Sequence, residues 1–316
     1  MAHGTHDHDH DPRNDEVLIR INDDLVPRAR AVVSVFDSGF LLGDGVWEGL
    51  RIVHGRPLFL DQHLDRLFEG AAAIDLDIGR SRDELAAMLA DTLAANGMND
   101  ASAADDAVHV RLMITRGTKS TPYQDPRFTV GPPTIVIVCE YKAPAERTVT
   151  DGIRLFTVHV RRGRPDVQDP GLNTHSKHNC ISACIQAAKA GADEALMLDP
   201  HGFVATCNST HFFIVRNGEV WTSTGDYCLA GITRANVLDL CAEHGLVARE
   251  RNFSLAHVYG ADEAFVTGTF AGVAPVTEVD GRVVGDGRRG PMTERLQSLY
   301  RQLVERDVAA ASTPPR

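Results

Sequence analysis

The chain has 316 residues, 43% hydrophobic and 24% charged, as expected for a globular protein of about two domains. No apolar run approaches the roughly 18 residues of a membrane span, and the polar, acidic N-terminus lacks the apolar core of a secretory signal. The net charge of −11 and the lack of a basic block argue against a nucleic-acid partner. Six cysteines without a CxxC pair favour free thiols and a cytoplasmic location.

The basic residues are mostly arginine. Only four of the 32 basic residues are lysines, namely Lys119, Lys142, Lys177 and Lys189. The arginine guanidinium stays protonated under physiological conditions, so it cannot act as an amine nucleophile. Any chemistry that needs such a nucleophile must therefore use one of these four lysines.

The first half begins with a His/Asp-rich tail, residues 1–15, which is predicted to be disordered. An N-terminal α/β domain is expected over residues 16–140, with strands at 17–21, 46–53, 108–115 and 134–138. Two helices are predicted from apolar residues that share one face: Leu60, Leu64, Leu67 and Ala71 in the first, and Leu85, Met88, Leu89 and Leu93 in the second. The polar stretch 141–150 contains Pro144 and is predicted to be the interdomain linker.

A second domain is expected over residues 151–308, followed by a disordered tail at residues 309–316. Its strands are predicted at 153–160, 194–199, 202–206, 211–215, 219–222, 263–267 and 272–276. Its helices are predicted at 178–189, 233–244 and 293–306. Strands and helices alternate without a strict βαβ repeat, which favours an α+β fold.

The segment His175-Ser176-Lys177-His178-Asn179-Cys180 is the densest group of reactive side chains. Lys177 lies at the predicted start of a helix, where the macrodipole and any protonated neighbouring histidine favour a neutral amine. A neutral amine is what a Schiff-base lysine requires. The alternatives are a solvated lysine, or a partial zinc set of His175, His178 and Cys180 that lacks a fourth ligand.

Two further segments could hold an anion. Gly231-Ile232-Thr233-Arg234 opens a predicted helix with Thr233 as a natural N-cap, and free amides at a helix start bind phosphate. Thr267-Gly268-Thr269 ends a predicted strand in a turn whose amides and hydroxyls could do the same. A helix that simply needs a cap explains the first segment equally well. Together with Lys177, however, the two segments suggest a phosphorylated aldehyde cofactor.

In this order the motifs resemble the class IV (fold-type IV) pyridoxal-phosphate aminotransferases. That family includes branched-chain amino acid, D-amino acid and (R)-amine transaminases, and aminodeoxychorismate lyase. The resemblance covers about residues 16 to 306. It is carried by GDGVWEGLR at 43–51, LDQHLDRL at 60–67, Lys177 in its loop-to-helix setting, GADEALMLDPHGFVA at 191–205, GITR at 231–234 and ADEAFVTGT at 261–269.

The resemblance implies an N-terminal α/β sandwich, a C-terminal pseudo-barrel, pyridoxal 5′-phosphate at their interface and a homodimer. It implies that Lys177 forms the Schiff base and that the phosphate is held by Arg66, the Ile232 and Thr233 backbone and the Thr269 hydroxyl. The LDQHLDRL window alone would instead predict an exposed Arg66. Arg111 matches an arginine near the substrate carboxylate in branched-chain enzymes. The resemblance also implies substrate contacts at Trp47 and Phe270.

The chain departs from the family pattern at three places. Thr206 stands where a glutamate usually contacts the pyridine nitrogen, and His211 stands at a usual asparagine. A threonine hydroxyl would bond a neutral nitrogen and leave a weaker electron sink, unless another acid reaches the ring. After Lys177, Asn179 comes earlier than the family's asparagine and no tyrosine follows. The loop Thr118–Tyr123 lacks the Arg/His pair of D-amino acid enzymes.

The sequence therefore predicts a homodimeric aminotransferase that moves an amino group from an amino acid or amine to a 2-oxo acid, with branched-chain L-amino acids favoured. In this hypothesis the Lys177 amine moves the proton between the substrate Cα and cofactor C4′. The alternatives are a lyase of the aminodeoxychorismate type, a D-amino acid or (R)-amine transaminase, a catalytically silent cofactor binder, and a metal-binding module built on the histidine tail. No resident metal is expected.

Overall fold

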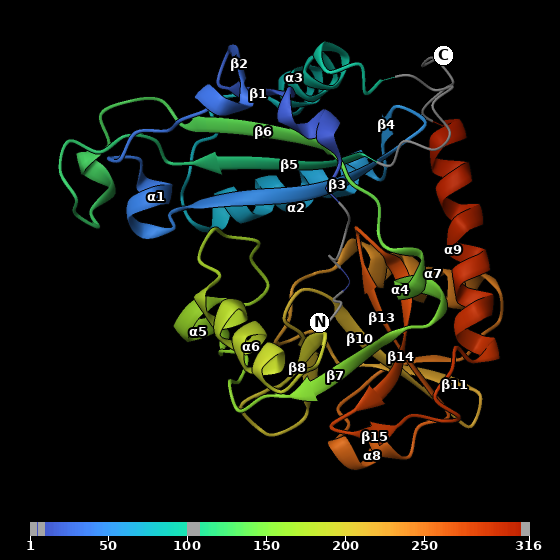
Figure 1. The fold of residues 1–316 in the computed structure, drawn as a ribbon. Coiled ribbons are helices and arrows are strands. Elements are labelled where there is room, and N and C mark those ends of the chain that lie inside the picture. Colours follow the sequence, from blue (N-terminus) through green and yellow to red (C-terminus); the bar gives the residue numbers. More distant parts are fainter. Residues whose placement is uncertain (1–4, 6–9, 100–107, 311–316) are drawn as a thin grey trace. The chain divides into compact units, whose positions relative to one another are not determined.

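The computed structural model describes residue 5 and residues 10–99 and 108–310, which divide into two compact units (Figure 1). The N-terminal unit comprises Asp9–Ala143, Leu172–Ser176 and Asp307–Arg316. The C-terminal unit comprises Met1–His8, Pro144–Gly171 and Lys177–Arg306. The chain thus crosses from one unit to the other directly before Lys177.

The N-terminal unit is built on an antiparallel sheet. Among the described residues it has six strands, in the order β2-β1-β6-β5-β3-β4. Their bounds are β1 (Leu18–Ile21), β2 (Asp24–Pro27), β3 (Gly45–Val53), β4 (Arg56–Pro57), β5 (Val108–Thr115) and β6 (Thr134–Tyr141). β3 pairs with β5 along its whole length, from Gly45 opposite Thr115 to Ile52 opposite Val108. This long register fixes which side chains of the two strands share a face.

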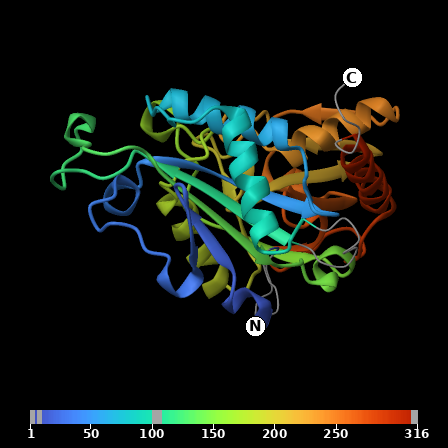
Figure 2. The same cartoon turned by 90° about the horizontal axis from the view of Figure 1, so that it is seen from above.

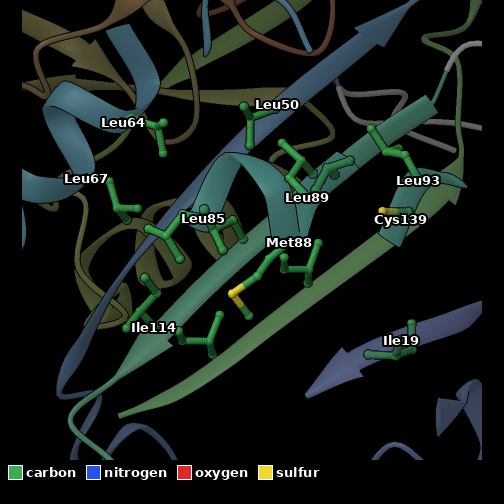
Figure 3. Packing of buried hydrophobic residues seen from close by; sticks show 14 of the residues in the cluster. Ile19, Leu50, Leu64, Leu67, Leu85, Met88, Leu89, Leu93, Ile114 and Cys139 are labelled. Atoms are coloured by element: carbon green, nitrogen blue, oxygen red, sulfur yellow. The ribbon is translucent and has the colours of Figure 1, made fainter. Parts of the chain in front are cut away.

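One face of this sheet carries the core of the unit. Side chains of a strand alternate between the two faces, and in β3 and β5 every second residue is buried. Helices α2 (Leu60–Ala73) and α3 (Arg82–Ala95) lie along that face (Figure 2). Their apolar stripes pack onto the sheet (Figure 3), with Leu64, Leu67, Leu85, Met88, Leu89 and Leu93 against Ile19, Leu50, Ile114 and Cys139.

The C-terminal unit is built on a larger mixed sheet. Within the described chain this sheet has the order β12-β11-β10-β13-β14-β7-β8-β9, with β15 on β14. Its strands are β7 (Ile153–Thr157), β8 (Glu194–Leu198), β9 (Val204–Cys207), β10 (His211–Arg216), β11 (Glu219–Thr222), β12 (Ala248–Glu250), β13 (Glu263–Gly268), β14 (Gly272–Val279) and β15 (Arg282–Val283). The sheet curls, because β9 at one end of the order returns to contact β10. A half-barrel results, as the predicted pseudo-barrel requires.

Helices lie around this curled sheet (Figure 1). They are α4 (Glu146–Thr150), α5 (Pro165–Gln168), α6 (His178–Lys189), α7 (Ile232–Glu243), α8 (Leu255–Tyr259) and α9 (Pro291–Ala310). The predicted α+β class is confirmed by the two sheets and their helices. Among the described residues, no helix has the length and apolar character of a membrane span.

The structure differs from the sequence predictions in two short helices and in one helix cap. The predicted linker 141–150 contains α4, and the predicted tail 1–15 contains the 3-10 helix η1 (Pro12–Asp15), while residues 1–4 and 6–9 lie outside the described part. The prediction of Thr233 as an N-cap was wrong. Gly231 is the N-cap of α7, because its carbonyl already accepts the first helical bond from the Ala235 amide at 2.9 Å.

Other short elements also fall outside the predictions. These are helix α1 (Ser38–Leu42) and the 3-10 turns η2 (Arg28–Arg30) and η3 (Pro126–Phe128). At the C-terminus, α9 continues to Ala310, into the predicted tail, of which residues 311–316 lie outside the described part. The predicted domain limits, 16–140 and 151–308, remain predictions.

Candidate functional site

Lys177 lies at the start of helix α6, as predicted. It is the N-cap residue, half-buried, and its carbonyl accepts the Ile181 amide at 2.9 Å, which closes the first turn. No described side chain caps this helix end, so the positive end of the helix dipole acts directly beside Lys177. Imine formation needs a lysine amine, and Lys177 provides one at this position.

The stretch before Lys177 is fixed on the N-terminal unit by backbone pairing with β3. The His175 amide donates to the Gly45 carbonyl at 2.9 Å, and the Trp47 amide donates to the Asn173 carbonyl at 3.0 Å. The Asn173 side-chain amide returns a bond to the Trp47 carbonyl at 2.6 Å. Residues 173–175 thus act as a short added strand, which holds the chain in place just ahead of the lysine.

Thr206 belongs to a buried hydroxyl–carboxylate network. It lies on β9, and its hydroxyl donates to the Thr210 carbonyl at 2.8 Å. The Thr210 hydroxyl donates to the Glu194 carboxylate at 2.7 Å, and the Thr5 hydroxyl donates to the same carboxylate. Burial raises the pKa of Glu194, against the opposing hydrogen bonds from Thr5 and Thr210. An acid, Glu194, therefore lies in this network, bonded to Thr210 rather than to Thr206.

The start of helix α7 offers backbone donors. Gly231, the N-cap, provides no side-chain cap, and neither does any other described residue. Ile232 and Thr233, the first helical residues, are 8% and 4% exposed. The first amides of a helix lack intrahelical partners, so this end can bind an anion. The backbone contacts of Ile232 and Thr233 with a phosphate remain a prediction.

The end of strand β13 carries the third group of predicted residues. β13 ends at Gly268, so Thr269 and Phe270 lie in the turn that leads to β14, and Phe270 is buried. Thr267, the preceding strand residue, is fully buried, and its hydroxyl oxygen has no hydrogen-bond partner among the described residues. A buried hydroxyl without a partner is unfavourable and rare, which makes this atom a candidate ligand contact.

Arg66 is held by a buried carboxylate. Its Nε donates to Glu48 Oε1 at 2.8 Å and its Nη2 donates to Glu48 Oε2 at 2.6 Å, while His63 Nδ1 lies 2.6 Å from the same Oε2. Burial by itself raises the pKa of Glu48, but hydrogen bonds from His63 and Arg66 outweigh it, so the pKa lies below its usual value. Glu48 thereby fixes the orientation of the Arg66 guanidinium along one of its edges.

Arg111 lies on the opposite face of the N-terminal sheet, flat against an aromatic ring. Its guanidinium carbon is 3.7 Å from the centre of the Trp47 ring, and burial lowers the pKa of this arginine. No described residue forms a hydrogen bond or ion pair with the guanidinium. The Trp47 indole is itself fixed, because Nε1 donates to the Thr174 carbonyl at 3.1 Å. The stacked arginine is therefore charged, oriented and able to bind a carboxylate.

Comparison with known proteins identifies the family. The family model described as amino-transferase class IV matches residues 45–279, which is most of the chain. The chain belongs to this class IV family. The predicted resemblance is thereby confirmed, and the curled sheet with its companion α/β unit is the fold expected of a fold-type IV aminotransferase.

Relatives of this class IV protein carry aminotransferase names. The chain is 40% identical over 294 residues to a branched-chain-amino-acid aminotransferase-like protein 2 of Arabidopsis thaliana, with 93% of this chain and 51% of the relative covered. It is 33% identical to a D-alanine aminotransferase of Listeria innocua, covering 89% and 94%. The chain spans about half the length of the plant relatives it matches.

A solved structure shows the same fold. The branched-chain aminotransferase of the archaeon Thermoproteus uzoniensis, solved with norvaline, superposes with a TM-score of 0.80 at 28% identity. The match covers 92% of this chain and 95% of the other. Likeness therefore extends over both units of the class IV chain.

The structure also reveals contacts that the sequence analysis did not identify in this class IV chain. Glu48 contacts both Arg66 and His63, and Glu194 joins the Thr206 network. A signal for Glu48 existed, since a charged residue occupies a buried position of the alternating strand 45–53. His63, three residues before Arg66, shares its helix face. Among the described residues, no group of three His, Cys, Asp or Glu side chains could hold a metal ion.

Proposed function

We propose that this class IV protein is a pyridoxal-phosphate-dependent aminotransferase that moves an amino group from an amino acid to a 2-oxo acid, with branched-chain L-amino acids favoured. The observation that carries the proposal is Lys177 at the start of α6, in a chain of this family. The names of the plant relative and of the superposed enzyme support the branched-chain preference.

The residues present fit a phosphorylated cofactor. The uncapped start of α7 supplies the Ile232 and Thr233 amides, the turn after β13 supplies the Thr269 hydroxyl, and Arg66 supplies positive charge. The buried, unpartnered Thr267 hydroxyl is a further donor of the kind a ligand would satisfy. When bound, pyridoxal phosphate supplies the aldehyde and the electron-withdrawing ring that the reaction needs.

The chain's own groups then hold the reactants and move protons. The Lys177 Nζ would hold the cofactor through its aldehyde, and as a neutral amine it would accept and return the proton of the substrate Cα. Arg111, stacked on Trp47, binds the substrate carboxylate, and Phe270 lines the substrate pocket. Orientation of the substrate by such groups lowers the entropic cost of the reaction.

Thr206 is proposed to contact the ring nitrogen. The hydroxyl proton is already donated to the Thr210 carbonyl, which leaves the Thr206 oxygen only acceptor lone pairs. An acceptor pairs with a protonated nitrogen, whereas donation to a neutral nitrogen would first break the Thr210 bond. Glu194 lies two hydrogen bonds away and is the nearest acid in this network.

A homodimer and a cytoplasmic setting complete the proposal. The homodimer is supported by exposed apolar side chains on one end of the N-terminal unit: Val32, Val35, Phe40, Tyr123 and Val130 are each at least half exposed. The six cysteines are free thiols, in keeping with a reducing compartment.

The visible absorption spectrum of wild type and Lys177→Ala, with and without borohydride, tests the proposal. We expect a band that borohydride bleaches and that the variant lacks, and loss of that band when L-leucine is added. A wild-type protein that shows no such band with excess cofactor contradicts the proposal.

A substrate panel separates the alternatives. Amino transfer to 2-oxoglutarate from L-leucine is expected to exceed that from D-alanine or an (R)-amine, because the 118–123 loop lacks the Arg/His pair. Pyruvate release from aminodeoxychorismate would favour the lyase. A bleachable band without turnover on any amine would favour a silent binder.

A further inference from the structure

His211 contacts the turn that leads into helix α7. The residue is 8% exposed, and its Nε2 donates to the Leu229 carbonyl at 2.7 Å. The ring lies so close to Gly231 that a Cβ at this glycine would be 2.3 Å from His211 Cε1. Gly231 has a φ of −75°, which any residue adopts, so glycine is required here for space rather than for backbone conformation.

The ring comes from a rigid part of the C-terminal unit. His211 opens β10, which lies between β11 and β13 in the sheet. The segment it contacts, residues 229–231, has no regular structure of its own. The hydrogen bond and the close packing therefore tie the last residues before α7 to the middle of the sheet. Because Gly231 is the N-cap, its position sets where the following amides lie.

A second observation points to a ligand at this place. Thr267 lies directly opposite His211 in the β10–β13 pair, so the two side chains share one face of the sheet. The Thr267 hydroxyl is buried and has no hydrogen-bond partner among the described residues. A polar ligand held at the start of α7, beside this strand end, would satisfy it.

We propose that His211 is a positioning residue for the cofactor phosphate: its ring fixes Leu229 and Gly231 so that the Ile232 and Thr233 amides meet the phosphate oxygens. This inference rests on the proposed function, which assigns the phosphate to those amides. His211 itself does not need to touch the cofactor. Its removal should weaken the recognition of the phosphate and spare recognition of the rest of the cofactor.

The test compares two ligands that differ only in the phosphate. Apoenzyme of the full chain is titrated with pyridoxal phosphate and with pyridoxal, following visible absorption. His211→Phe keeps a ring but loses the N–H, and His211→Ala loses both the ring and the N–H. Both are expected to weaken pyridoxal phosphate binding about tenfold, as expected for one lost hydrogen bond, and pyridoxal binding less than about twofold. The phosphorus NMR resonance of the bound cofactor should also shift.

His257→Asn is the matched control. His257 lies on α8 of the same unit and bonds the Ser254 amide at 3.2 Å, so the substitution also removes a histidine contact at a helix start. We expect the ratio of the two affinities to stay at the wild-type value. A purely structural role of His211 would lower the melting temperature and both affinities together, which would contradict the inference.

A double-mutant cycle keeps the inference testable if the histidine variants are poorly folded. Gly231→Ala places a Cβ against the ring and is expected to weaken pyridoxal phosphate binding. In the His211→Ala background the ring is gone, so the same substitution should have much less effect. Equal effects in both backgrounds would overturn the inference.

Thr269→Ala separates failure of the inference from failure of the proposed function. If Thr269→Ala lowers the preference for pyridoxal phosphate over pyridoxal and the His211 variants do not, the phosphate site stands and His211 has no part in it. If wild type shows no preference and Thr269→Ala changes nothing, the proposed phosphate site itself is wrong.

Discussion

Arg111 and Trp47 provide a test of substrate binding at the level of single residues. The guanidinium has no hydrogen-bond partner in the described chain, so a carboxylate can occupy its donors without displacing another group. We expect Arg111→Gln to lower kcat/KM for amino acid and 2-oxo acid about 100-fold, the equivalent of about 3 kcal/mol for a charged pair. Cofactor binding should not change. Steady-state kinetics and cofactor titration measure the two effects.

Arg251 supplies the control for that experiment. Its guanidinium lies 4.3 Å from the centre of the Trp221 ring on the C-terminal unit, in the same stacked arrangement. Arg251→Gln should leave kcat/KM at the wild-type value. If both variants lose activity equally, stacked arginines serve stability in this protein and Arg111 is not the carboxylate contact.

The depressed pKa of Glu48 leads to a prediction of how the free energy of unfolding depends on pH. Its pKa is depressed in the folded protein, because His63 and Arg66 outweigh the effect of burial. A depressed carboxyl pKa adds stability that is present above the unfolded pKa and is lost as the pH falls through the folded pKa. The free energy of unfolding should therefore fall from about pH 5 to pH 3, in part through this residue.

Glu48→Gln should remove that part of the acid dependence. We expect a loss of about 3 kcal/mol at pH 7, since the variant leaves Arg66 with an incomplete partner, and a smaller difference from wild type near pH 3. Urea denaturation at both pH values measures it. Glu69→Gln, on the exposed side of α2, is the control. A constant difference between wild type and Glu48→Gln at all pH values would show that the ionised form is not what matters.

At the level of elements, helix α9 depends on a carboxylate from strand β13. Glu263 accepts the amides of Met292 and Thr293 at 2.9 and 2.8 Å and the Thr293 hydroxyl at 2.7 Å. Glu263→Gln replaces one acceptor oxygen by a donor and removes a charge at the positive end of the helix. We expect it to lower the free energy of unfolding by about 2 kcal/mol, measured by urea denaturation.

The control lies in the first turn of the same helix. Glu294 is exposed and pairs with Arg289 at 2.6 Å, and surface pairs of this kind contribute little. Glu294→Gln should change stability by less than about 0.5 kcal/mol. If Glu294→Gln costs as much as Glu263→Gln, helix charge alone accounts for the effect and the buried cap is unimportant.

The sequence predicts helices and strands well where the pattern of apolar and polar residues repeats several times. The alternation in residues 45–53 and 108–115 matches β3 and β5, and the apolar stripes predict α2 and α3. Helices of four or five residues, such as α1 and α4, have too few turns to show a period. The predicted strand 202–206 begins instead at Val204, because Asp199 accepts the His201 and Phe203 amides in a turn.

Some features of the candidate site could likewise be predicted from local sequence, and others could not. The placement of Lys177 at a helix start follows from local sequence, and so does a helix that begins near residue 232, although its N-cap is Gly231 rather than the predicted Thr233. Contacts across strands and helices do not, because they depend on register and packing. The bond between Glu48 and Arg66 joins residues 18 positions apart, and the packing of His211 on Gly231 joins different elements. Sequence patterns therefore identify the chemistry, and the fold supplies its supporting contacts.

At the level of the whole molecule, one apolar area of the N-terminal unit is the proposed dimer contact. The segments that carry it are joined, since the Ser38 amide donates to the Gly117 carbonyl at 2.9 Å and the Lys119 amide donates to the Phe36 carbonyl at 2.9 Å. Phe40 on α1 is 70% exposed and Val130 is 65% exposed. Apolar side chains clustered in this way typically mark an interface.

Phe40→Asp is expected to weaken the homodimer, because an aromatic side chain at the centre of an interface contributes about 2 kcal/mol, roughly 30-fold in the dissociation constant. Sedimentation over a concentration series measures the shift from dimer to monomer. Val283→Asp, at a 60% exposed position on β15 of the C-terminal unit, is the matched control and should leave the dimer intact. A Phe40→Asp protein that stays fully dimeric at nanomolar concentration would place the interface elsewhere, whereas a wild-type monomer would refute the homodimer itself.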